Sequence, residues 1–124
     1  MILFDTCIMI EYLKDNIDIV NLVNKINIDN IFISDIIIME LYIGALDNSD
    51  LKYIQRRISN FRKLDTNQNI IGLAKDIVSK YCLSHRCKMN DSIIASTSII
   101  YDIDLFTYNL KDFKYIPGIK LFKL

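Results

Sequence analysis

A strand and a helix meet in residues 31–45, whose sequence is IFISDIIIMELYIGA. The first three residues form a short apolar run typical of a buried strand, and Ser34 and Asp35 are natural N-caps for the helix that follows. Glu40 is the only charge in that helix beyond its first turn, and its branched and aromatic neighbours leave almost no polar face. A buried, unpaired carboxylate is unfavourable by several kcal/mol or takes up a proton. We therefore expect Glu40 to have a compensating partner.

Two further acids stand beside apolar segments elsewhere in the chain. Asp5 ends the apolar opening at 2–4, and Asp91 precedes the apolar run at 93–95. Either acid also fits a plainer role as the N-cap of the helix that follows it, whereas Glu40 lies in mid-helix and has no such role. Three acids attached to apolar elements far apart in sequence predict one shared polar pocket that holds a cation.

The fold class follows from the way short apolar segments alternate with helical patterns. Strands are expected at 2–4, 31–33 and 105–107, with an edge strand at 119–122. Helices are expected at 7–14, 17–28, 35–46, from the turn at 47–50 to about 61, at 67–84 and at 91–101. This alternation predicts an α/β/α sandwich, with a short, mostly parallel sheet flanked by helices. Ligands bind such sheets beyond the carboxyl ends of the strands, where Asp5, Asn109 and Asp112 are expected.

Size and composition favour a single ordered domain over residues 1–124. Half of the chain is apolar (52%), with only three glycines and one proline, which is enough for a sizeable core. The three cysteines cannot all pair, and the first residues do not resemble a secretory leader. The longest apolar stretch contains acids and is too short to span a bilayer. We therefore expect a cytoplasmic protein with no membrane partner.

The formal net charge is zero, but the charges are segregated along the chain. Residues 1–50 hold two lysines against nine acids, and residues 51–124 hold thirteen basic residues against six acids. Basic residues cluster at 52–63 and recur at Arg86, Lys88, Lys111 and Lys114. They suit a rim that attracts phosphate around an acidic metal pocket, or, more plainly, a solvated helix face. The sequence leaves both interpretations open.

Carboxylates without a nucleophile favour metal chemistry over covalent catalysis. Mg²⁺ and Mn²⁺ prefer hard oxygen ligands, and the bound ion activates water and offsets charge on a phosphodiester. The chain offers no credible Ser, Cys or His nucleophile, and it has no glycine-rich nucleotide loop. The spacing of Cys82, His85 and Cys87 does not match a structural zinc site.

Taken in order, four sequence blocks resemble a PIN-domain ribonuclease, specifically the VapC-type toxin of prokaryotic toxin–antitoxin pairs. The first is the opening strand with Asp5 and Thr6, and the second runs from Ile33 to Ala45 with Glu40. The third is the segment 90–95 with Asp91, and the fourth is the segment 107–118 with Asp112. Each block alone has low specificity, but the four together, in order and with this spacing, cover the whole chain.

The resemblance implies a metal-dependent endoribonuclease that cuts RNA, with tRNA as one possible target. It implies that Asp5 and Asp91 are direct Mg²⁺ ligands, with Mn²⁺ as a substitute, and that Glu40 and Asp112 complete the acidic site. It also implies supporting hydrogen bonds from three neighbouring polar side chains: Thr6, Thr107 and Asn109. A VapB-like antitoxin and a second copy of the chain, as a homodimer, are the implied protein partners.

The fourth acid is the main departure from the family pattern. Some relatives have an acid where this chain has Asn109, which carries no charge, so Asp112 must supply the fourth carboxylate if one is needed. Two alternative functions stay open. One is a catalytically silent PIN-like module that binds RNA or protein, and the other is a metal nuclease that acts on other nucleic acid.

Overall fold

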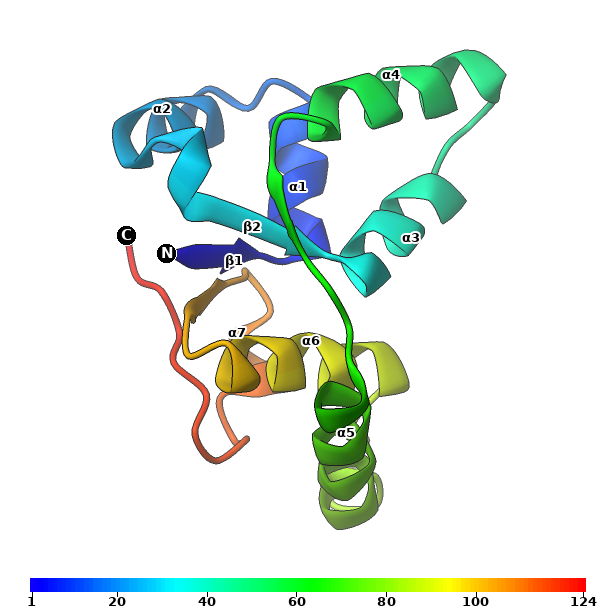
Figure 1. Cartoon of the computed structure of the whole chain (residues 1–124), viewed down its shortest axis with the longest axis vertical. Helices are drawn as coiled ribbons and strands as arrows, with labels where there is room; N and C mark the ends of the chain where they lie inside the picture. Colours follow the sequence, from blue (N-terminus) through cyan, green and yellow to red (C-terminus); the bar gives the residue numbers. More distant parts are fainter.

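The computed structural model describes all 124 residues, arranged as four short strands, seven α-helices and one 3₁₀ turn (Figure 1). The elements follow in the order β1 (Ile2–Phe4), α1 (Thr6–Leu13), α2 (Ile17–Ile26), η1 (Ile28–Asn30), β2 (Ile31–Ser34), α3 (Asp35–Ile43), α4 (Asn48–Ile58), β3 (Arg62–Leu64), α5 (Gln68–Tyr81), α6 (Met89–Ile100), β4 (Asp104–Phe106) and α7 (Leu110–Phe113). No helix is long and apolar enough to cross a membrane.

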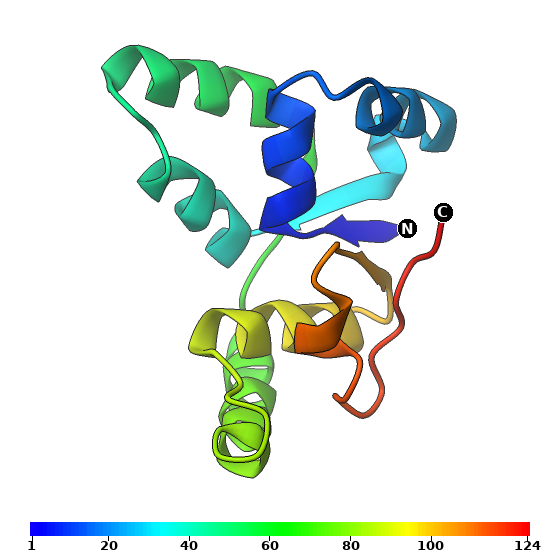
Figure 2. The ribbon, with the colours of Figure 1, turned by 180° about the vertical axis from the view of Figure 1, so that it is seen from behind.

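The strands form one parallel sheet in the order β3-β2-β1-β4. Ile2 of β1 is in register with Ile31 of β2 on one side and with Asp104 of β4 on the other. Helices α1 to α4 lie on one side of the sheet and α5 to α7 on the other, as Figures 1 and 2 both show. The predicted α/β/α sandwich is thus confirmed, and the carboxyl ends of β1, β2 and β4 meet at one edge.

The central strands are short apolar runs because helices cover them on both faces. Leu3 and Phe4 of β1 are completely buried. Ile8 of α1 and Ile94 of α6 belong to the same core and are also buried. A strand that is buried on both faces needs apolar residues at consecutive positions, and this explains why β1 and β2 can be recognised in the sequence.

Side-chain caps fix where several helices begin. The Asn16 side chain accepts hydrogen bonds from the backbone of α2, Asp47 caps α4, and Asn67 caps α5. Helix α2 ends at Ile26, two residues before its predicted end, because Asn27 adopts a left-handed backbone with φ of 79°. Asn tolerates this conformation better than most residues, so it terminates the helix.

Two sequence predictions about the sheet are wrong. The helix expected to reach about 61 ends at Ile58, and a third strand, β3, follows at Arg62–Leu64. Both of its first two residues are exposed, so it lacks the apolar signature of a buried strand. The segment 119–122 forms only a single bridge, Leu121 with Leu105, in place of the expected edge strand.

Helix α3 is less buried than its sequence suggests. Ile37 and Leu41 face the core, whereas Met39 is 50% exposed and Ile43 is 84% exposed. The predicted caps also differ. The Ser34 side chain makes no capping hydrogen bond, and the Asp35 carboxylate instead accepts the backbone N–H of Thr66 at 2.9 Å. An apolar strip of α3 therefore faces solvent without an intramolecular partner.

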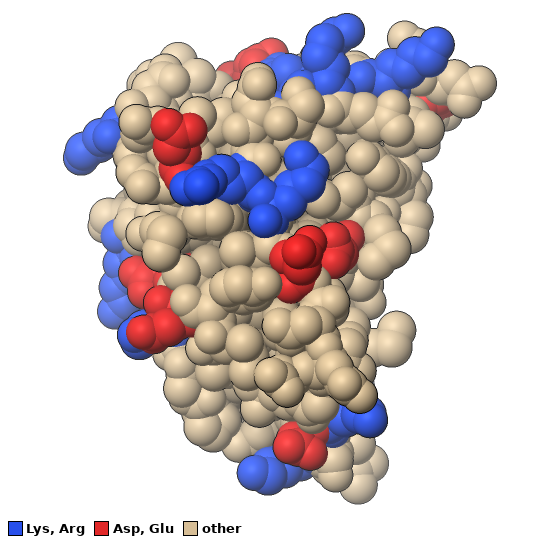
Figure 3. Space-filling view, in the orientation of Figure 1, with Lys and Arg blue, Asp and Glu red and all other residues tan.

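The basic cluster at 52–63 is divided between α4 and β3, and basic side chains gather over the α4 end of the molecule (Figure 3). Arg57 forms an ion pair with Asp15 at 3.0 Å and lies 4.7 Å from the centre of the Tyr12 ring. Arg62 lies over the ring of Phe32. These two side chains hold elements of the fold together, a structural role that is neither a phosphate-attracting rim nor a solvated helix face.

Candidate active site

Asp5 is held rigidly at the carboxyl end of β1. Its backbone N–H donates to the carbonyl of Phe106 in β4, and one carboxylate oxygen accepts the backbone N–H of Thr6 at 2.8 Å. The other oxygen accepts the Thr107 hydroxyl at 2.7 Å, and only 4% of the residue is exposed. Asp5 therefore caps α1, as the plainer interpretation required, while its second oxygen is directed by β4.

Thr107 links Asp5 to the segment that follows β4. Its hydroxyl donates to Asp5 and accepts the backbone N–H of Asn109 at 3.0 Å, so both of its hydrogen-bonding functions are used. The half-buried Cys7 thiol lies 3.6 Å from the same hydroxyl and accepts the backbone N–H of Tyr108. Cys7 packs within this network of hydrogen bonds.

Glu40 connects three helices from its place in the middle of α3. The Thr6 hydroxyl of α1 donates to Oε1 at 2.8 Å, and the side-chain amide of Asn90 in α6 donates to Oε2 at 3.3 Å. The compensating partners expected for this carboxylate are therefore two neutral donors. Thr6 contacts Asp5 through its backbone and Glu40 through its hydroxyl, so it joins the first and second acids directly.

Asp91 is the third residue of α6, which begins at Met89 with Lys88 as its N-cap residue. The capping role considered for Asp91 is thus wrong, because the helix starts two residues earlier. The pKa of Asp91 is raised from 3.8 to about 6, mainly by burial and further by the charges of Asp5, Asp112 and Glu40. Lys88 acts in the opposite direction. The charge of Asp91 is therefore opposed both by burial and by the other three acids.

The pKa of Asp5 is also raised, mainly by burial and further by the charge of Glu40, while hydrogen bonds from Thr107 and Thr6 oppose the rise. The four predicted acids thus form one electrostatically coupled group at the carboxyl edge of the sheet. Asp112 is its exposed member, on α7, whereas Asn109 contributes its backbone N–H to Thr107. Neutral donors satisfy only part of this excess negative charge.

The donor set suits a hard divalent cation. Carboxylate and hydroxyl oxygens are the ligands that Mg²⁺ and Mn²⁺ prefer. No three His, Cys, Asp or Glu side chains lie close enough together to hold one ion by direct contact. Mg²⁺ usually takes one or two carboxylates from the protein and keeps several waters, so it does not need a closed cage of protein ligands.

A divalent cation held by Asp91 would bind more weakly as the pH falls, because the Asp91 proton would compete with the cation. With a pKa of about 6, the carboxylate is mostly ionised at pH 7 and mostly protonated at pH 5. The affinity should therefore be about tenfold weaker at pH 5 than at pH 7. Titration calorimetry across this range measures it. Asp112→Asn removes one charge that raises the pKa of Asp91, so the pH at which the affinity changes should be lower in this variant. An affinity that stays constant between pH 5 and pH 7 in the parent protein would contradict the expectation.

Comparison with known proteins identifies the class of this fold and site. The family model of the PIN domain matches residues 2–119, and the chain belongs to this family. Along 99% of its length it is 29% identical to Ribonuclease VapC2 of Methanocaldococcus jannaschii, of which 93% is covered.

Solved structures agree with this assignment. A chain of a toxin–antitoxin complex from Klebsiella pneumoniae is 26% identical, with complete coverage of both chains and a TM-score of 0.80. A chain of DNA-bound VapBC from Salmonella typhimurium is 24% identical and superimposes with a TM-score of 0.85, covering 98% of this chain and 96% of that one. Asp5 and Glu40, with their partners Thr107 and Thr6, thus lie within a fold that this chain shares with these structures along almost its whole length.

Sequence reasoning missed one polar residue of the site and two aromatic residues beside it. Asn90 donates to Glu40, but its position next to Asp91 gave no separate signal. Tyr115 stacks on His85, with ring centres 4.2 Å apart, and the pKa of its hydroxyl is raised by burial, by the Cys87 thiol and by the charges of Asp91 and Asp112. A pairing between a loop residue and a residue 30 positions later has no periodic pattern from which it could be predicted.

Proposed function

We propose that this protein is a metal-dependent endoribonuclease, the toxin of a VapBC-type toxin–antitoxin pair. The observation that carries the proposal is the hydrogen-bond network at the carboxyl edge of the sheet in a PIN domain. Thr6 contacts both Asp5 and Glu40, and Asn90, which precedes Asp91, donates to Glu40, while the charge of Asp112 acts on Asp91. The likeness to a protein named as a VapC ribonuclease supports RNA as the substrate. We further propose Mg²⁺ as the cofactor, with Mn²⁺ as a substitute, and tRNA as one possible target.

The residues of the site have distinct tasks in this proposal. A bound divalent cation supplies an activated water and offsets negative charge on the phosphodiester. Asp5 and Asp91 would hold the cation, and Glu40 and Asp112 would complete the negative site. Thr107 fixes the orientation of Asp5, while Thr6 and Asn90 fix that of Glu40, so the carboxylates need little rearrangement when substrate binds.

Cleavage assays with three substrates test the proposal. Purified protein is incubated with single-stranded RNA, tRNA or single-stranded DNA in Mg²⁺, in Mn²⁺ or in excess chelator. We expect RNA products with either metal and none with chelator. RNA binding without products under all conditions would instead identify a binding module, and equal cleavage of DNA would identify a broader metal nuclease.

A VapB-like antitoxin is the proposed inhibitory partner. The exposed apolar strip of α3 offers a docking surface near Glu40, formed by Met39, Ile43 and the following Leu46, which is 90% exposed. Several similar solved structures are toxin–antitoxin or VapBC complexes, which supports such a partner. A basic side chain of the antitoxin that reaches the acids would replace the charge of the cation.

The variant Ile43→Asp should weaken inhibition, because the added charge would be buried against the apolar surface of the antitoxin. Its RNA cleavage without antitoxin is measured in parallel, since Ile43 lies one helical turn from Glu40. We expect at least tenfold weaker inhibition by the neighbouring gene product, measured as the antitoxin concentration that halves RNA cleavage. Ile17→Asp, at a similarly exposed isoleucine on α2, is the matched control. Equal inhibition of Ile43→Asp and the parent would rule out this surface.

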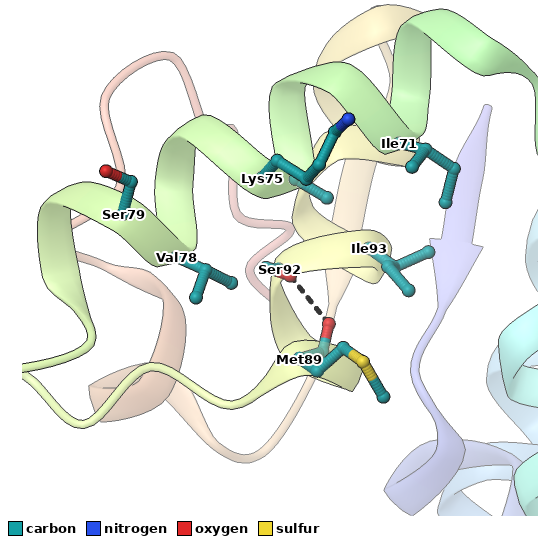
Figure 4. Close-up of a pocket in the computed structure, with 8 residues that line it drawn as sticks. Ile71, Lys75, Val78, Ser79, Met89, Ser92 and Ile93 are labelled. Carbon is teal, nitrogen blue, oxygen red and sulfur yellow. Dashed lines mark hydrogen bonds between the residues drawn. The ribbon is translucent and has the colours of Figure 1, made fainter.

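We also propose that the chain forms a homodimer through the apolar groove between α5 and α6. The groove has a volume of about 480 Å³, and Figure 4 shows Ile71 and Val78 of α5 facing Met89 and Ile93 of α6 along it. The surface that the groove exposes is almost entirely apolar. Met89, one of its lining residues, is 69% exposed in the single chain. Burial of this surface against a second copy would remove it from water.

Ile71→Asp should therefore shift the protein towards monomer, with a dimer dissociation constant at least tenfold higher. Light scattering coupled to size-exclusion chromatography over a range of concentrations measures this shift. Ile100→Asp is a matched control, because it lies at the far end of α6 and has a similar exposure of 42%, against 39% for Ile71. A parent protein that is monomeric at all concentrations would disprove the dimer.

A further inference from the structure

A basic cleft opens beside the acidic site, on the side of α7. The loop between α5 and α6 forms one wall, and α7 with the residues just after it forms the other. The cleft has a volume of about 640 Å³, and Asp112 of the candidate site is part of its lining. Four cations and a stacked aromatic pair dominate the remainder: Arg86, Lys88, Lys111, Lys114, His85 and Tyr115.

None of the four cations of the cleft forms an ion pair within the protein. All four are exposed, and the ion pairs of this structure are Arg57 with Asp15 and Lys120 with Asp102, so none involves a cation of the cleft. Four unpaired positive charges next to a group of carboxylates produce a sharp change in electrostatic potential across a short distance. An anionic polymer whose reactive phosphate lies at the acids would have its neighbouring phosphates attracted to the cleft.

The aromatic pair gives the cleft a preformed flat surface. The rings of His85 and Tyr115 are stacked, 4.2 Å apart and 17° from parallel. Tyr81 packs edge-on against both rings, at 5.5 Å from His85 and 5.1 Å from Tyr115. His85 is nonetheless exposed, and its Nδ1 lies 2.7 Å from the Ser84 hydroxyl, so neighbouring groups order a side chain that solvent still reaches. Nucleobases stack on such surfaces, and a surface that is already ordered loses little entropy on binding.

We propose that this cleft is a subsite for the single-stranded nucleotides that flank the cleaved bond. In this assignment the exposed surface of His85 stacks on a base, and Arg86, Lys88, Lys111 and Lys114 contact backbone phosphates. The proposal rests on the proposed function, since it adds a substrate-binding surface to the same acidic site. An acidic protein segment would use the cations but would not need the stacked rings. Loss of the His85 ring should therefore weaken the binding of single-stranded nucleic acid but not the binding of an acidic protein segment.

Binding measured without cleavage tests the subsite. Fluorescence anisotropy with a labelled single-stranded RNA of eight nucleotides, in excess chelator, reports affinity for the parent protein and its variants. His85→Ala should weaken binding about tenfold, as expected for the loss of one stacked base, and leave the salt dependence unchanged. Lys114→Gln should lower the slope of log affinity against log salt by about 0.7, as expected for one lost phosphate contact.

Matched controls separate the cleft from general effects of charge or loop disruption. Leu83→Ala lies in the same loop as His85 with a 94% exposed side chain, and Lys25→Gln removes a charge on α2, across the sheet; neither should change affinity. An oligonucleotide without bases should bind the parent as weakly as RNA binds His85→Ala. An acidic peptide that binds equally well and is equally sensitive to His85→Ala would overturn the assignment to nucleic acid.

The outcomes distinguish this proposal from the proposed function. If the parent protein cleaves RNA but the His85 and Lys114 variants bind RNA as the parent does, the subsite is wrong and the nuclease stands. If the variants lose RNA binding as described but the parent never cleaves RNA, the subsite is supported and the nuclease is wrong.

Discussion

Asp91→Asn is expected to lower the rate of RNA cleavage by about a thousandfold, equivalent to about 4 kcal/mol of transition-state stabilisation. The substitution keeps the shape of the side chain but removes the charge that a divalent cation needs. The assay is cleavage of RNA in Mg²⁺ under single-turnover conditions. Asp76→Asn on α5 removes an exposed acid that is outside the coupled group and should leave the rate unchanged.

The same variant should be more stable than the parent in the absence of metal. Folding raises the pKa of Asp91 from 3.8 to about 6, so the folded protein binds this proton more tightly than the unfolded chain. The ionised carboxylate is therefore destabilising above pH 6, and its penalty disappears as the pH falls from 6 towards 3.8. Allowing for solvent screening, we expect a gain of about 1–2 kcal/mol at pH 7.5, or roughly 3–8 °C in melting temperature.

Two results would contradict this account of Asp91. One is cleavage by Asp91→Asn at the rate of the parent protein. The other is a lower melting temperature for the variant in chelator at pH 7.5, since this would mean that the charge stabilises the fold. Loss of activity together with gain of stability is the combination expected of a residue kept for function.

Thr107→Val should reduce cleavage by about 10- to 100-fold through its effect on Asp5. Valine has the same shape but cannot donate to the buried Asp5 carboxylate at 2.7 Å or accept the N–H of Asn109. The Asp5 carboxylate would lose a partner in a buried environment and the Asn109 N–H would lose one in a part-buried environment, so we also expect a loss of about 1–3 kcal/mol of stability. Cleavage kinetics and urea denaturation measure the two effects.

Two matched variants isolate the hydroxyl of Thr107. Thr107→Ser retains the hydroxyl and should recover most of the activity. Thr97→Val removes another buried threonine hydroxyl, one that donates to the carbonyl of Ile93 within α6, and should alter stability but not cleavage. A Thr107→Val protein that cleaves within twofold of the parent would show that this hydrogen bond does not orient Asp5 for catalysis.

The features that could be predicted from sequence are those that follow from burial. The segment 2–4 is recognisable as a strand because helices cover both of its faces, and Glu40 is conspicuous because a charge is rare among branched apolar residues. The order of apolar segments and helices then predicts the sandwich and the edge at which the acids gather. These inferences depend only on local composition and on the general geometry of parallel sheets.

The features that could not be predicted depend on contacts between distant residues or on solvent-facing backbone. Strand β3 is held by backbone pairing with β2, so the exposed Arg62 and Lys63 give no strand signal. The start of α6 at Met89 uses no side-chain cap, so the sequence offered Asp91 as a possible cap without deciding between that role and a functional one. The donation from Asn90 to Glu40 joins residues 50 positions apart, which no local pattern encodes.

The central place of β1 has a consequence for when activity can first arise. β1 lies between β2 and β4, and the bond between Asp5 and Thr107 joins residues 102 positions apart. During synthesis the first strand leaves the ribosome long before its last neighbour, so the orientation of Asp5 is completed only when almost the entire chain has emerged. A site ordered in this way cannot be complete while most of its chain is still being translated.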